Sequence, residues 1–377
     1  MKEIGVYIHI PFCKSKCYYC DFNSFSNKEN SINDYIECLK KEIINKSSFE
    51  YLIKTIYIGG GTPSYIDCKY IEEILGILRN HYNISEDVEI TIEVNPGTAN
   101  KDKLEKYYAI GINRLSIGLQ TSNNQILKSI GRIHSFEQYK QTIDLAKQAG
   151  FSNINSDIII GLPSQTIYDI EDTINSLIDM GLQHISVYSL IIEEGTVLEN
   201  KIKNKELKLP DEEIERYMYW FAKRKLEKNG FKHYEISNFA KPGFVSKHNL
   251  DCWNQKEYIG FGVSASSYEN KTRFSNIGNL DEYIKNINTN SFEKNYIIEE
   301  KQTLEAEQNE FMILGLRKIS GIRINDFRKK FGRSPLIVYE KQIKELIAQE
   351  LIALDVDSIK LTKKGLDFAN LVWEEFI

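Results

Sequence analysis

Short apolar runs alternate with amphipathic stretches along the first half of the chain. The apolar runs are rich in Ile, Val and Tyr and are bounded by Gly, Pro or Asn, which is typical of β-strands. The stretches between them repeat their apolar residues at three- and four-residue steps, as in residues 32–46 and 102–111, which predicts helices. Six strands are expected, at residues 5–10, 55–60, 88–95, 114–120, 154–160 and 184–192.

This alternation predicts an α/β fold in which crossover helices connect the strands of a mostly parallel sheet. A doubly wound sheet and an incomplete barrel both fit the pattern. In either fold the functional groups are expected at the carboxyl ends of the strands, because the loops that follow the strands gather there.

The pattern changes after residue 210. Residues 211–230 read as one long helix with an acidic start, and an aromatic region rich in Gly and Ser follows. The end of the chain reads as helix, short hairpin and helix, which is a winged-helix-like pattern. Three parts are therefore expected: an α/β core at 1–210, an α+β extension at 211–298 and a small C-terminal winged-helix-like domain at 299–377.

Composition and charge narrow the classes of function. Apolar residues make up 42% of the 377 residues and charged residues 27%, which is ordinary for a globular protein with a large core. A formal charge of −5 argues against nucleic-acid binding, and the basic stretch at 317–333 lacks the interleaved aromatic residues of a nucleic-acid surface. No signal peptide and no apolar run of about 20 residues is found. A cytoplasmic location is expected, and peripheral membrane association stays open.

Three cysteines, Cys13, Cys17 and Cys20, follow the first expected strand with the spacing C-x₃-C-x₂-C. Clustered cysteines in a reducing compartment more often hold a metal or do redox work than form disulfides. Three thiolates can hold three corners of a [4Fe–4S] cluster and leave one iron for a small molecule, whereas electron-transfer clusters usually have four cysteines. A zinc site completed by His9 and a chance cluster with a disulfide also fit this spacing.

The residues between the cysteines add a resemblance. The sequence "CKSKCYYCDF" resembles C-x₃-C-x-Φ-C, with Φ aromatic, which is the signature of radical S-adenosylmethionine (SAM) proteins. The resemblance implies a [4Fe–4S] cluster on the three cysteines, with the amino and carboxylate groups of SAM on the fourth iron. It also implies a partial, TIM-like (β/α)₆ barrel, so we expect the barrel and not the doubly wound sheet.

A second set of residues resembles the SAM pocket of the branch that contains oxygen-independent coproporphyrinogen III oxidase. The segment "GGGTP" is similar to the motif that contacts the methionine end of SAM, and polar residues follow near later strand ends. Taken singly, each of these has a plainer interpretation as a loop, a cap or a surface residue. The resemblance implies a SAM pocket lined by Tyr7, Tyr19, Gly60, Gly61, Thr62, Glu93, Gln120, Arg132, Asp157 and Ile191.

Roles within that pocket are hypotheses. An arginine fork suits a carboxylate, so Arg132 is assigned to the carboxylate of the methionine moiety. Gln120 and Asp157 are assigned to the ribose hydroxyls. An acid beside a run of isoleucines, as at Asp157, is costly to bury without a partner, which favours a functional role for it.

Two features separate this chain from the decarboxylating oxidase. The oxidase carries a further cysteine two residues after the third, where this chain has Phe22, and it has a longer segment before the cluster. Both features favour the related haem chaperones of the HemW type, so coproporphyrinogen III oxidase activity is not expected.

The segment "HNLDCW" resembles the H-N-x-x-Y-W motif that is implicated in haem binding in those chaperones. The resemblance implies that His248 ligates haem iron and that Trp253 packs on the macrocycle. Cys252 stands where the family usually has Tyr. Three roles are open for it: a second iron ligand, a covalent attachment point for haem, or a small apolar substitute for the tyrosine. The plainer interpretation is that "HN" caps a turn and Trp253 fills the core.

The expected function is therefore that of a haem chaperone, which binds haem as cargo and passes it to an unidentified acceptor protein. It would carry a [4Fe–4S] cluster, served by a reductant, and an exchangeable SAM. The alternative is a radical SAM enzyme that acts on a tetrapyrrole, by oxidative decarboxylation of coproporphyrinogen III or by modification of haem.

Overall fold

The six expected strands are parallel neighbours in one twisted sheet. A computed structural model describes all 377 residues. The strands follow in chain order: β1 (Lys2–Ile10), β2 (Tyr51–Gly60), β3 (Asn83–Val94), β4 (Arg114–Gln120), β5 (Ile154–Ile160) and β6 (His184–Ser189). β4 and β5 have the bounds that the sequence predicted. β1, β2 and β3 begin earlier than expected, and β6 ends three residues before the predicted end.

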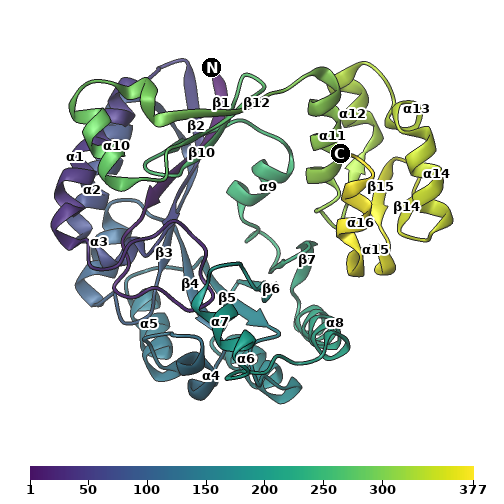
Figure 1. The fold of residues 1–377 in the computed structure, drawn as a ribbon, viewed down its shortest axis with the longest axis horizontal. Coiled ribbons are helices and arrows are strands. Elements are labelled where there is room, and N and C mark those ends of the chain that lie inside the picture. The colour runs from purple at the N-terminus through teal and green to yellow at the C-terminus, as the bar shows by residue number, and fades with distance from the viewer.

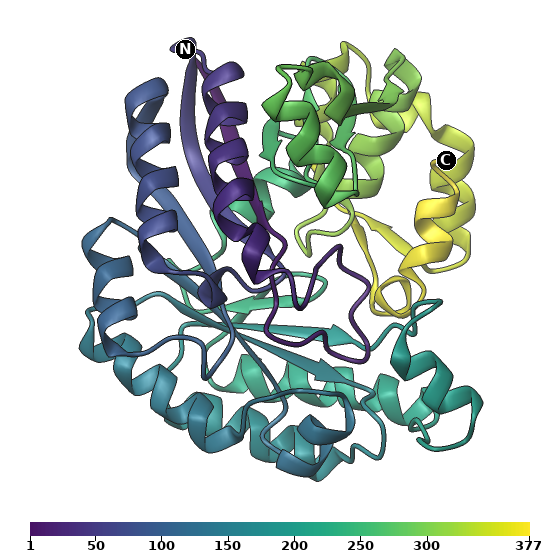
Figure 2. The same cartoon turned by 60° about the vertical axis from the view of Figure 1, so that its left-hand side comes forward.

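Helices cover the convex face of this sheet (Figure 2). They pack Ile and Leu side chains against the Ile and Leu residues that alternate along the strands. Asn123, Ser135 and Thr166 cap three of them by accepting backbone N–H bonds, as the first turn of a helix requires. These helices are α1 (Ile32–Asn45), α2 (Cys68–His81), α3 (Lys101–Ala109), α4 (Asn124–Ser129), α5 (Phe136–Gln148) and α6 (Ile167–Asp179).

The concave face of the sheet is polar, and this face holds the site. Along β4, Leu115, Ile117 and Leu119 are buried in the core, while the alternate residues face inward. The inward residues of the neighbouring strands include Thr55, Thr91 and His184, all buried. Buried polar groups need partners, so this lumen, which we call the barrel lumen, must satisfy its own hydrogen bonds or bind something.

The extension continues the same sheet on both sides. β9 (Tyr258–Phe261) pairs in parallel with β1, and β8 (Asn238–Ala240) pairs antiparallel with β6. Twelve strands therefore form one sheet, which the sequence did not predict. The remaining elements of the extension are α7 (Val197–Lys203), α8 (Glu212–Lys228), β7 (Lys232–Glu235), α9 (Lys247–Trp253), β10 (Ser266–Glu269), β11 (Thr272–Asn276), α10 (Leu280–Asn288) and β12 (Tyr296–Lys301).

The C-terminal part has its own core of 13 buried residues. A helix, a short strand, further helices and a hairpin follow in the order of a winged helix, as the sequence predicted. The elements are α11 (Leu304–Gly315), β13 (Ile322–Arg323), α12 (Ile324–Phe331), α13 (Pro335–Val338), α14 (Glu340–Ala348), β14 (Ile352–Leu354), β15 (Ser358–Leu361), α15 (Lys363–Asp367) and α16 (Ala369–Glu374). The domain boundaries at 210/211 and 298/299 stay predictions.

Helix α9 lies between the barrel and the C-terminal domain (Figure 1). No helix of the chain combines the length and the apolar composition that crossing a membrane requires.

Candidate functional site: a cleft at the carboxyl ends of the barrel strands

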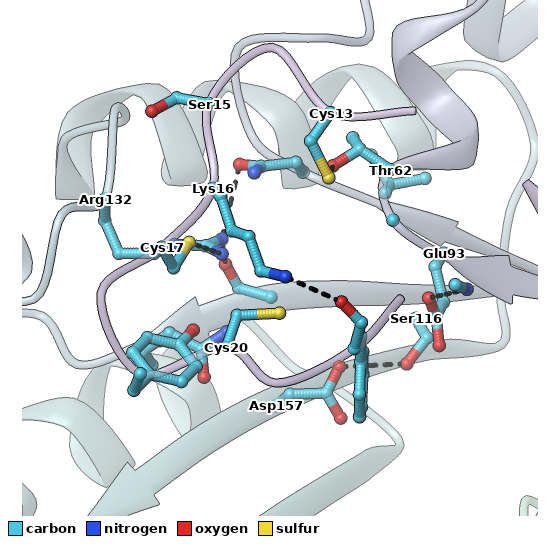
Figure 3. A pocket seen from close by; sticks show the side chains of 18 of the residues that line it. Cys13, Ser15, Lys16, Cys17, Cys20, Thr62, Glu93, Ser116, Arg132 and Asp157 are labelled. Atoms are coloured by element: carbon cyan, nitrogen blue, oxygen red, sulfur yellow. Dashed lines mark hydrogen bonds between the residues drawn. The ribbon is translucent and has the colours of Figure 1, made fainter. Parts of the chain in front are cut away.

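A cleft of about 340 Å³ opens at the carboxyl ends of the barrel strands, beside the loop that follows β1 (Figure 3). The three cysteines Cys13, Cys17 and Cys20 line it. So do eight of the ten residues expected around SAM, namely Tyr19, Gly60, Gly61, Thr62, Glu93, Gln120, Arg132 and Asp157.

The other two expected residues, Tyr7 and Ile191, do not line the cleft. The Tyr7 ring lies 6.3 Å from that of Tyr57, which does line it, and the Tyr7 hydroxyl is bonded to Nδ1 of His9 at 3.0 Å. Ile191 follows the end of β6 and is 67% exposed. In this structure, Tyr7 therefore supports the wall of the cleft from behind, and the side chain of Ile191 lies outside it.

The cysteine loop is fixed at its base by backbone hydrogen bonds. The Cys13 N–H donates to the Phe25 carbonyl at 2.9 Å, and the Phe25 N–H donates to the Pro11 carbonyl at 2.6 Å. Oγ1 of Thr62 donates to the sulfur of Cys13 at 3.5 Å. A Cβ atom on Gly61 would lie 2.9 Å from the Cys13 sulfur, so only glycine lets the end of β2 approach this loop so closely.

Arg132 connects the cysteine loop to two strand ends. Its Nη1 donates to the sulfur of Cys17 at 3.5 Å, and its Nη2 donates to the carbonyl of Gly118 at 2.7 Å. Nη2 also lies 3.3 Å from Oδ1 of Asn95. A guanidinium in this position places positive charge and N–H donors at the cysteines and along the cleft wall.

The three cysteines offer free thiols at one cleft. All six cysteines of the chain are free, and no three metal-ligating side chains converge on one point, as a single zinc ion would need. Both ring nitrogens of His9 are engaged, with the Tyr7 hydroxyl and with the Asn23 carbonyl. The three sulfurs lie around the cleft (Figure 3). A cubane [4Fe–4S] cluster on three cysteines would take one thiolate on each of three irons.

Burial keeps Cys13 and Cys20 as thiols in the absence of a metal. Burial raises the pKa of Cys13 and raises that of Cys20 to about 11. A metal must therefore displace protons from these thiols, and cluster binding is expected to release them.

Two buried carboxyl groups lie deeper in the cleft. Glu93 accepts from the Tyr57 hydroxyl at 2.9 Å and from the Gly60 N–H at 3.1 Å. Burial, and after it the negative charge of Asp157, raises the pKa of Glu93 to about 7. Burial likewise raises the pKa of Asp157, which accepts from Ser116 at 3.0 Å. Both groups would be stabilised as carboxylates by a ligand that brings positive charge or hydrogen-bond donors.

The end of β4 carries backbone strain. Gln120 has φ +72°, in the left-handed region that non-glycine residues rarely adopt, and it is buried. A Cβ atom on Gly118 would lie 2.9 Å from Nε2 of Gln120 and 3.1 Å from Nη2 of Arg132. Glycine at 118 therefore makes room for both side chains. Strain of this kind is concentrated at functional sites.

Sequence reasoning missed further lining residues. These are Ser15, Lys16, Phe22, Tyr57, Val94, Asn95, Ser116, Gly118, Ile159 and Tyr188. One signal could have found several of them. Ser116 and Gly118 lie four and two residues before Gln120, and Ile159 lies two after Asp157, so strand alternation puts them on the same face as a predicted residue.

The candidate haem histidine lies in the barrel lumen, behind the cleft wall. His248 of α9 is 8% exposed, its Nδ1 lies 2.9 Å from Oγ1 of Thr55, and its ring lies 5.2 Å from that of Tyr57. Glu89 accepts from the backbone N–H groups of Lys247 and His248. Burial, and after it the charge of Arg114, lowers the pKa of His248 to about 4, so the imidazole is neutral at neutral pH.

The other two residues of the segment lie elsewhere. The guanidinium of Arg317, from the C-terminal domain, lies 4.3 Å from the centre of the Trp253 ring. Cys252 is half-buried, and burial raises the pKa of its thiol to about 12. His248 and Trp253 are five residues apart on a helix and so point in different directions. The structure thus brings His248 to the lumen and Trp253 to the C-terminal domain.

Comparison with known proteins decides the family. The model of the radical SAM superfamily matches residues 7–177, and that of the HemN C-terminal domain matches residues 302–368. The chain is 39% identical over 377 residues to the "Heme chaperone HemW" of Lactococcus lactis, covering 100% of this chain and 98% of that one. The chain belongs to the HemW family of radical SAM proteins.

A second HemW relative supports this placement, and one solved structure shares the fold. The "Heme chaperone HemW" of Bacillus subtilis is 37% identical over 376 residues, covering 99% of both chains. Coproporphyrinogen III oxidase (HemN) from Escherichia coli superposes with a TM-score of 0.86 at 22% identity, over 100% of this chain and 90% of that one. That likeness confirms the expected radical SAM fold of this HemW-family chain.

Membership of the radical SAM superfamily implies a [4Fe–4S] cluster and SAM as cofactors. For this HemW-family chain, the donor set at Cys13, Cys17 and Cys20 and the polar cleft beside it fit both groups. Phe22, two residues after Cys20, lines the cleft as well.

Proposed function

We propose that this chain binds haem and delivers it to an acceptor protein, with a [4Fe–4S] cluster on its three cysteines and SAM in the cleft. The observation that carries the proposal is the likeness to two curated haem chaperones over the whole chain, from the cysteine loop through α9 to the C-terminal domain. The acceptor protein and the reductant for the cluster are partners that this function requires.

The cleft residues bind and orient SAM. Cys13, Cys17 and Cys20 would hold the cluster, which would supply one iron without a protein thiolate for SAM. Arg132 neutralises the carboxylate of SAM while it keeps its bond to Cys17. Glu93 accepts a hydrogen bond from the amino group, and Gln120 and Asp157 accept bonds from the ribose hydroxyls. These roles match the burial of both acids, which need donors from a ligand.

His248 is the proposed axial ligand of the haem iron. A histidine ligates iron through a nitrogen lone pair, and a hydrogen bond from its other nitrogen selects the tautomer. In His248 the bond between Nδ1 and Thr55 leaves Nε2 as the ligating atom when Nδ1 is the donor. The low pKa of His248 means that no proton competes with iron at neutral pH.

Haem can reach His248 only when α9 moves, because this side chain is buried in the lumen. The C-terminal end of α9 is held by Gln255, whose Nε2 donates to the Glu307 carbonyl at 3.1 Å and to Oε2 of Glu310 at 2.8 Å. Lys330 donates to Oε1 of Gln255 at 2.7 Å. The C-terminal domain thereby controls the position of the proposed haem ligand.

A pair of assays tests the proposal. The anaerobically reconstituted protein is titrated with haem while the Soret band is followed, and then mixed with an apo haem protein to measure transfer. We expect His248→Ala to weaken haem binding at least about tenfold. His81→Ala, a histidine on the outer helix α2, is the control and should leave binding unchanged.

The second assay incubates the reduced protein with SAM and coproporphyrinogen III. Formation of protoporphyrinogen would overturn the chaperone proposal in favour of a tetrapyrrole enzyme. Haem binding that is unchanged in His248→Ala would overturn the choice of ligand and leave the chaperone proposal standing.

A further inference from the structure

Lys103, on the outer helix α3, binds three backbone carbonyl groups with its ammonium. Its Nζ donates to the carbonyl of Ser64 at 2.8 Å, to that of Ile66 at 3.0 Å and to that of Thr98 at 3.3 Å. An ammonium has three N–H donors, so these bonds use all of them. The side chain is therefore fully engaged with the backbone of the loops beside α3.

The other lysines of α3 that pair do so with acids. Lys101 and Lys106 form ion pairs with Glu105 and Glu72, whereas Lys103 pairs with no carboxylate. Burial lowers the pKa of Lys103, as expected for a cation that is partly removed from water. Holding a long, flexible side chain in one place costs conformational entropy. Lys103 is thus a cation tied to carbonyl groups, and not a solvated surface charge.

The carbonyl groups that Lys103 binds depend on it. No other protein group donates a hydrogen bond to the carbonyl of Ile66 or to that of Thr98. Ile66 is buried, and buried carbonyl groups need a partner. Lys103 therefore gives these loops the donors that backbone N–H groups supply within a helix or a sheet.

The three carbonyl groups belong to two loops that both reach the cleft. Two of them lie in the loop between β2 and α2, which carries the cleft residue Thr62. The third lies in the loop between β3 and α3, which carries the cleft residue Asn95. Lys103 thus ties together the loops that follow two neighbouring strands of the barrel.

Two hydroxyl groups join the same loops next to the ammonium. Oγ of Ser64 lies 2.6 Å from Oγ1 of Thr98 and accepts from the Asn95 N–H at 3.0 Å. Oγ1 of Thr98 donates to the Asn95 carbonyl at 2.7 Å. The backbone of Asn95 is therefore held on both sides by residues whose carbonyl groups Lys103 binds.

Both loops contact residues that are proposed to hold the cofactors. Oγ1 of Thr62 donates to the sulfur of Cys13 at 3.5 Å, and Oδ1 of Asn95 lies 3.3 Å from Nη2 of Arg132. Arg132 in turn donates to the sulfur of Cys17. A shift of either loop would therefore move one wall of the cleft relative to the cysteines.

We propose that Lys103 is a positioning residue of the cleft, whose ammonium holds the loops after β2 and β3 in the arrangement that binds SAM. The inference rests on the proposed function, because SAM is the ligand that the cleft is proposed to bind. Lys103 does not line the cleft itself. It acts through Thr62 and Asn95, so its loss should weaken SAM binding without removing a ligand of the cluster.

The experiment replaces the ammonium and measures SAM binding. Wild type and variants are reconstituted anaerobically, and SAM affinity is measured by calorimetric titration. We expect Lys103→Met, which keeps the length but loses all three donors, to bind SAM at least about tenfold more weakly. Lys103→Arg, which keeps N–H donors, should recover most of this loss. Lys106→Met, one turn along α3, is the matched control and should bind SAM as the wild type does.

Electron paramagnetic resonance separates positioning from a loss of structure. Without SAM, the reduced Lys103→Met protein should show the wild-type spectrum and the wild-type content of iron and sulfide. The change that SAM causes in this spectrum should require a higher SAM concentration. Haem binding without SAM should also be unchanged, because His248 lies in the lumen. A role in folding alone predicts instead that cluster content and haem binding fall together with SAM affinity.

If Lys103→Met does not fold, Lys103→Gln tests the same point. Its side chain is one bond shorter and cannot reach all three carbonyl groups, so SAM binding should again be weaker. Wild-type SAM affinity in either variant would overturn the inference. Equal losses in Lys103→Met and Lys106→Met would also overturn it, because they would point to the charge of α3 and not to the three bonds. A wild-type protein that binds no SAM would instead overturn the proposed role of the cleft.

Discussion

The guanidinium of Arg132 donates to the sulfur of Cys17 across 3.5 Å. This contact joins two groups that the sequence places 115 residues apart. It means that the residue proposed to bind the carboxylate of SAM also touches a proposed cluster ligand, so one side chain acts on both cofactors.

Replacing Arg132 should therefore change a property of the cluster as well as SAM binding. Hydrogen bonds to cluster sulfurs raise the reduction potential, so Arg132→Met is expected to lower it and to weaken SAM binding at least about tenfold. The potential is measured by redox titration followed by electron paramagnetic resonance without SAM. Lys128→Met, one turn away on α4, serves as the control. An unchanged potential would show that the contact does not tune the cluster.

SAM binding should depend on pH through Glu93. Its pKa in the free protein is about 7, and the ionised carboxylate is the better acceptor for the amino group of SAM. Affinity should rise as the pH increases from 5.5 through 7 and level off at about pH 8. Calorimetric titration of the wild type and of Glu93→Gln across this range checks it. The variant should bind more weakly, with a flat profile.

The carboxyl group of Glu93 should also make folding stability depend on pH, and stability should fall where SAM affinity rises. Its pKa is raised from 4.5 to about 7, so between these values the folded protein binds more protons than the unfolded chain. The contribution of Glu93 to the free energy of unfolding is therefore fully present below pH 4.5. It is lost as the pH rises through 7, and the loss amounts to about 3 kcal/mol. The difference in urea stability between wild type and Glu93→Gln at pH 5 and pH 8 measures this term. A difference that is constant with pH would contradict it.

Haem binding through His248 should be nearly independent of pH between 6 and 8. The imidazole has a pKa of about 4 in the folded protein, so it is already neutral across this range. Thr55→Val, which removes the partner of Nδ1, should weaken haem binding about three- to tenfold by releasing the tautomer and the ring orientation. Both effects are read from the Soret band. A midpoint near 6.5 would indicate a solvent-exposed histidine as the ligand.

The hydrogen bonds between Gln255, just after α9, and the C-terminal domain should limit the rate of haem uptake. Gln255 has φ +53°, so Gln255→Gly removes the side chain without adding backbone strain. Loss of its hydrogen bonds is expected to reduce stability by about 2 kcal/mol. Amide exchange in α9 and the haem association rate should both increase. Gln349→Gly, at the exposed end of α14, is the control. Faster exchange in α9 without faster haem uptake would show that α9 does not gate the site.

The bounds of a strand could be predicted from the sequence where the residues at its ends differ clearly from the apolar run between them. β4 and β5 were predicted with their exact bounds because polar residues border their apolar runs. β3 begins at Asn83, five residues before the prediction, because "NISED" is too polar to read as a strand. Its first residues are held by pairing with β2, from Leu52 to Asn83, which no local pattern reveals.

The site likewise contains residues that the sequence could predict and residues that it could not. The cysteines and the glycine run stand out because such residues are rarely clustered by chance. Tyr57 and Ser116 are ordinary strand residues, and only their alternation with neighbouring residues marks them as inward-facing. The contact between Arg317 and Trp253 depends on how the C-terminal domain docks, and the parallel pairing of β9 with β1 joins distant segments. Neither relationship has a signal in the sequence.

The ring of Tyr57 has one face in the wall of the cleft and packs on His248 in the lumen. Two ligands that press on one ring influence each other, and thermodynamics makes that influence mutual. Whatever factor SAM imposes on the affinity for haem, haem must impose on the affinity for SAM. A titration of haem in the presence of SAM therefore measures the effect of each ligand on the affinity for the other.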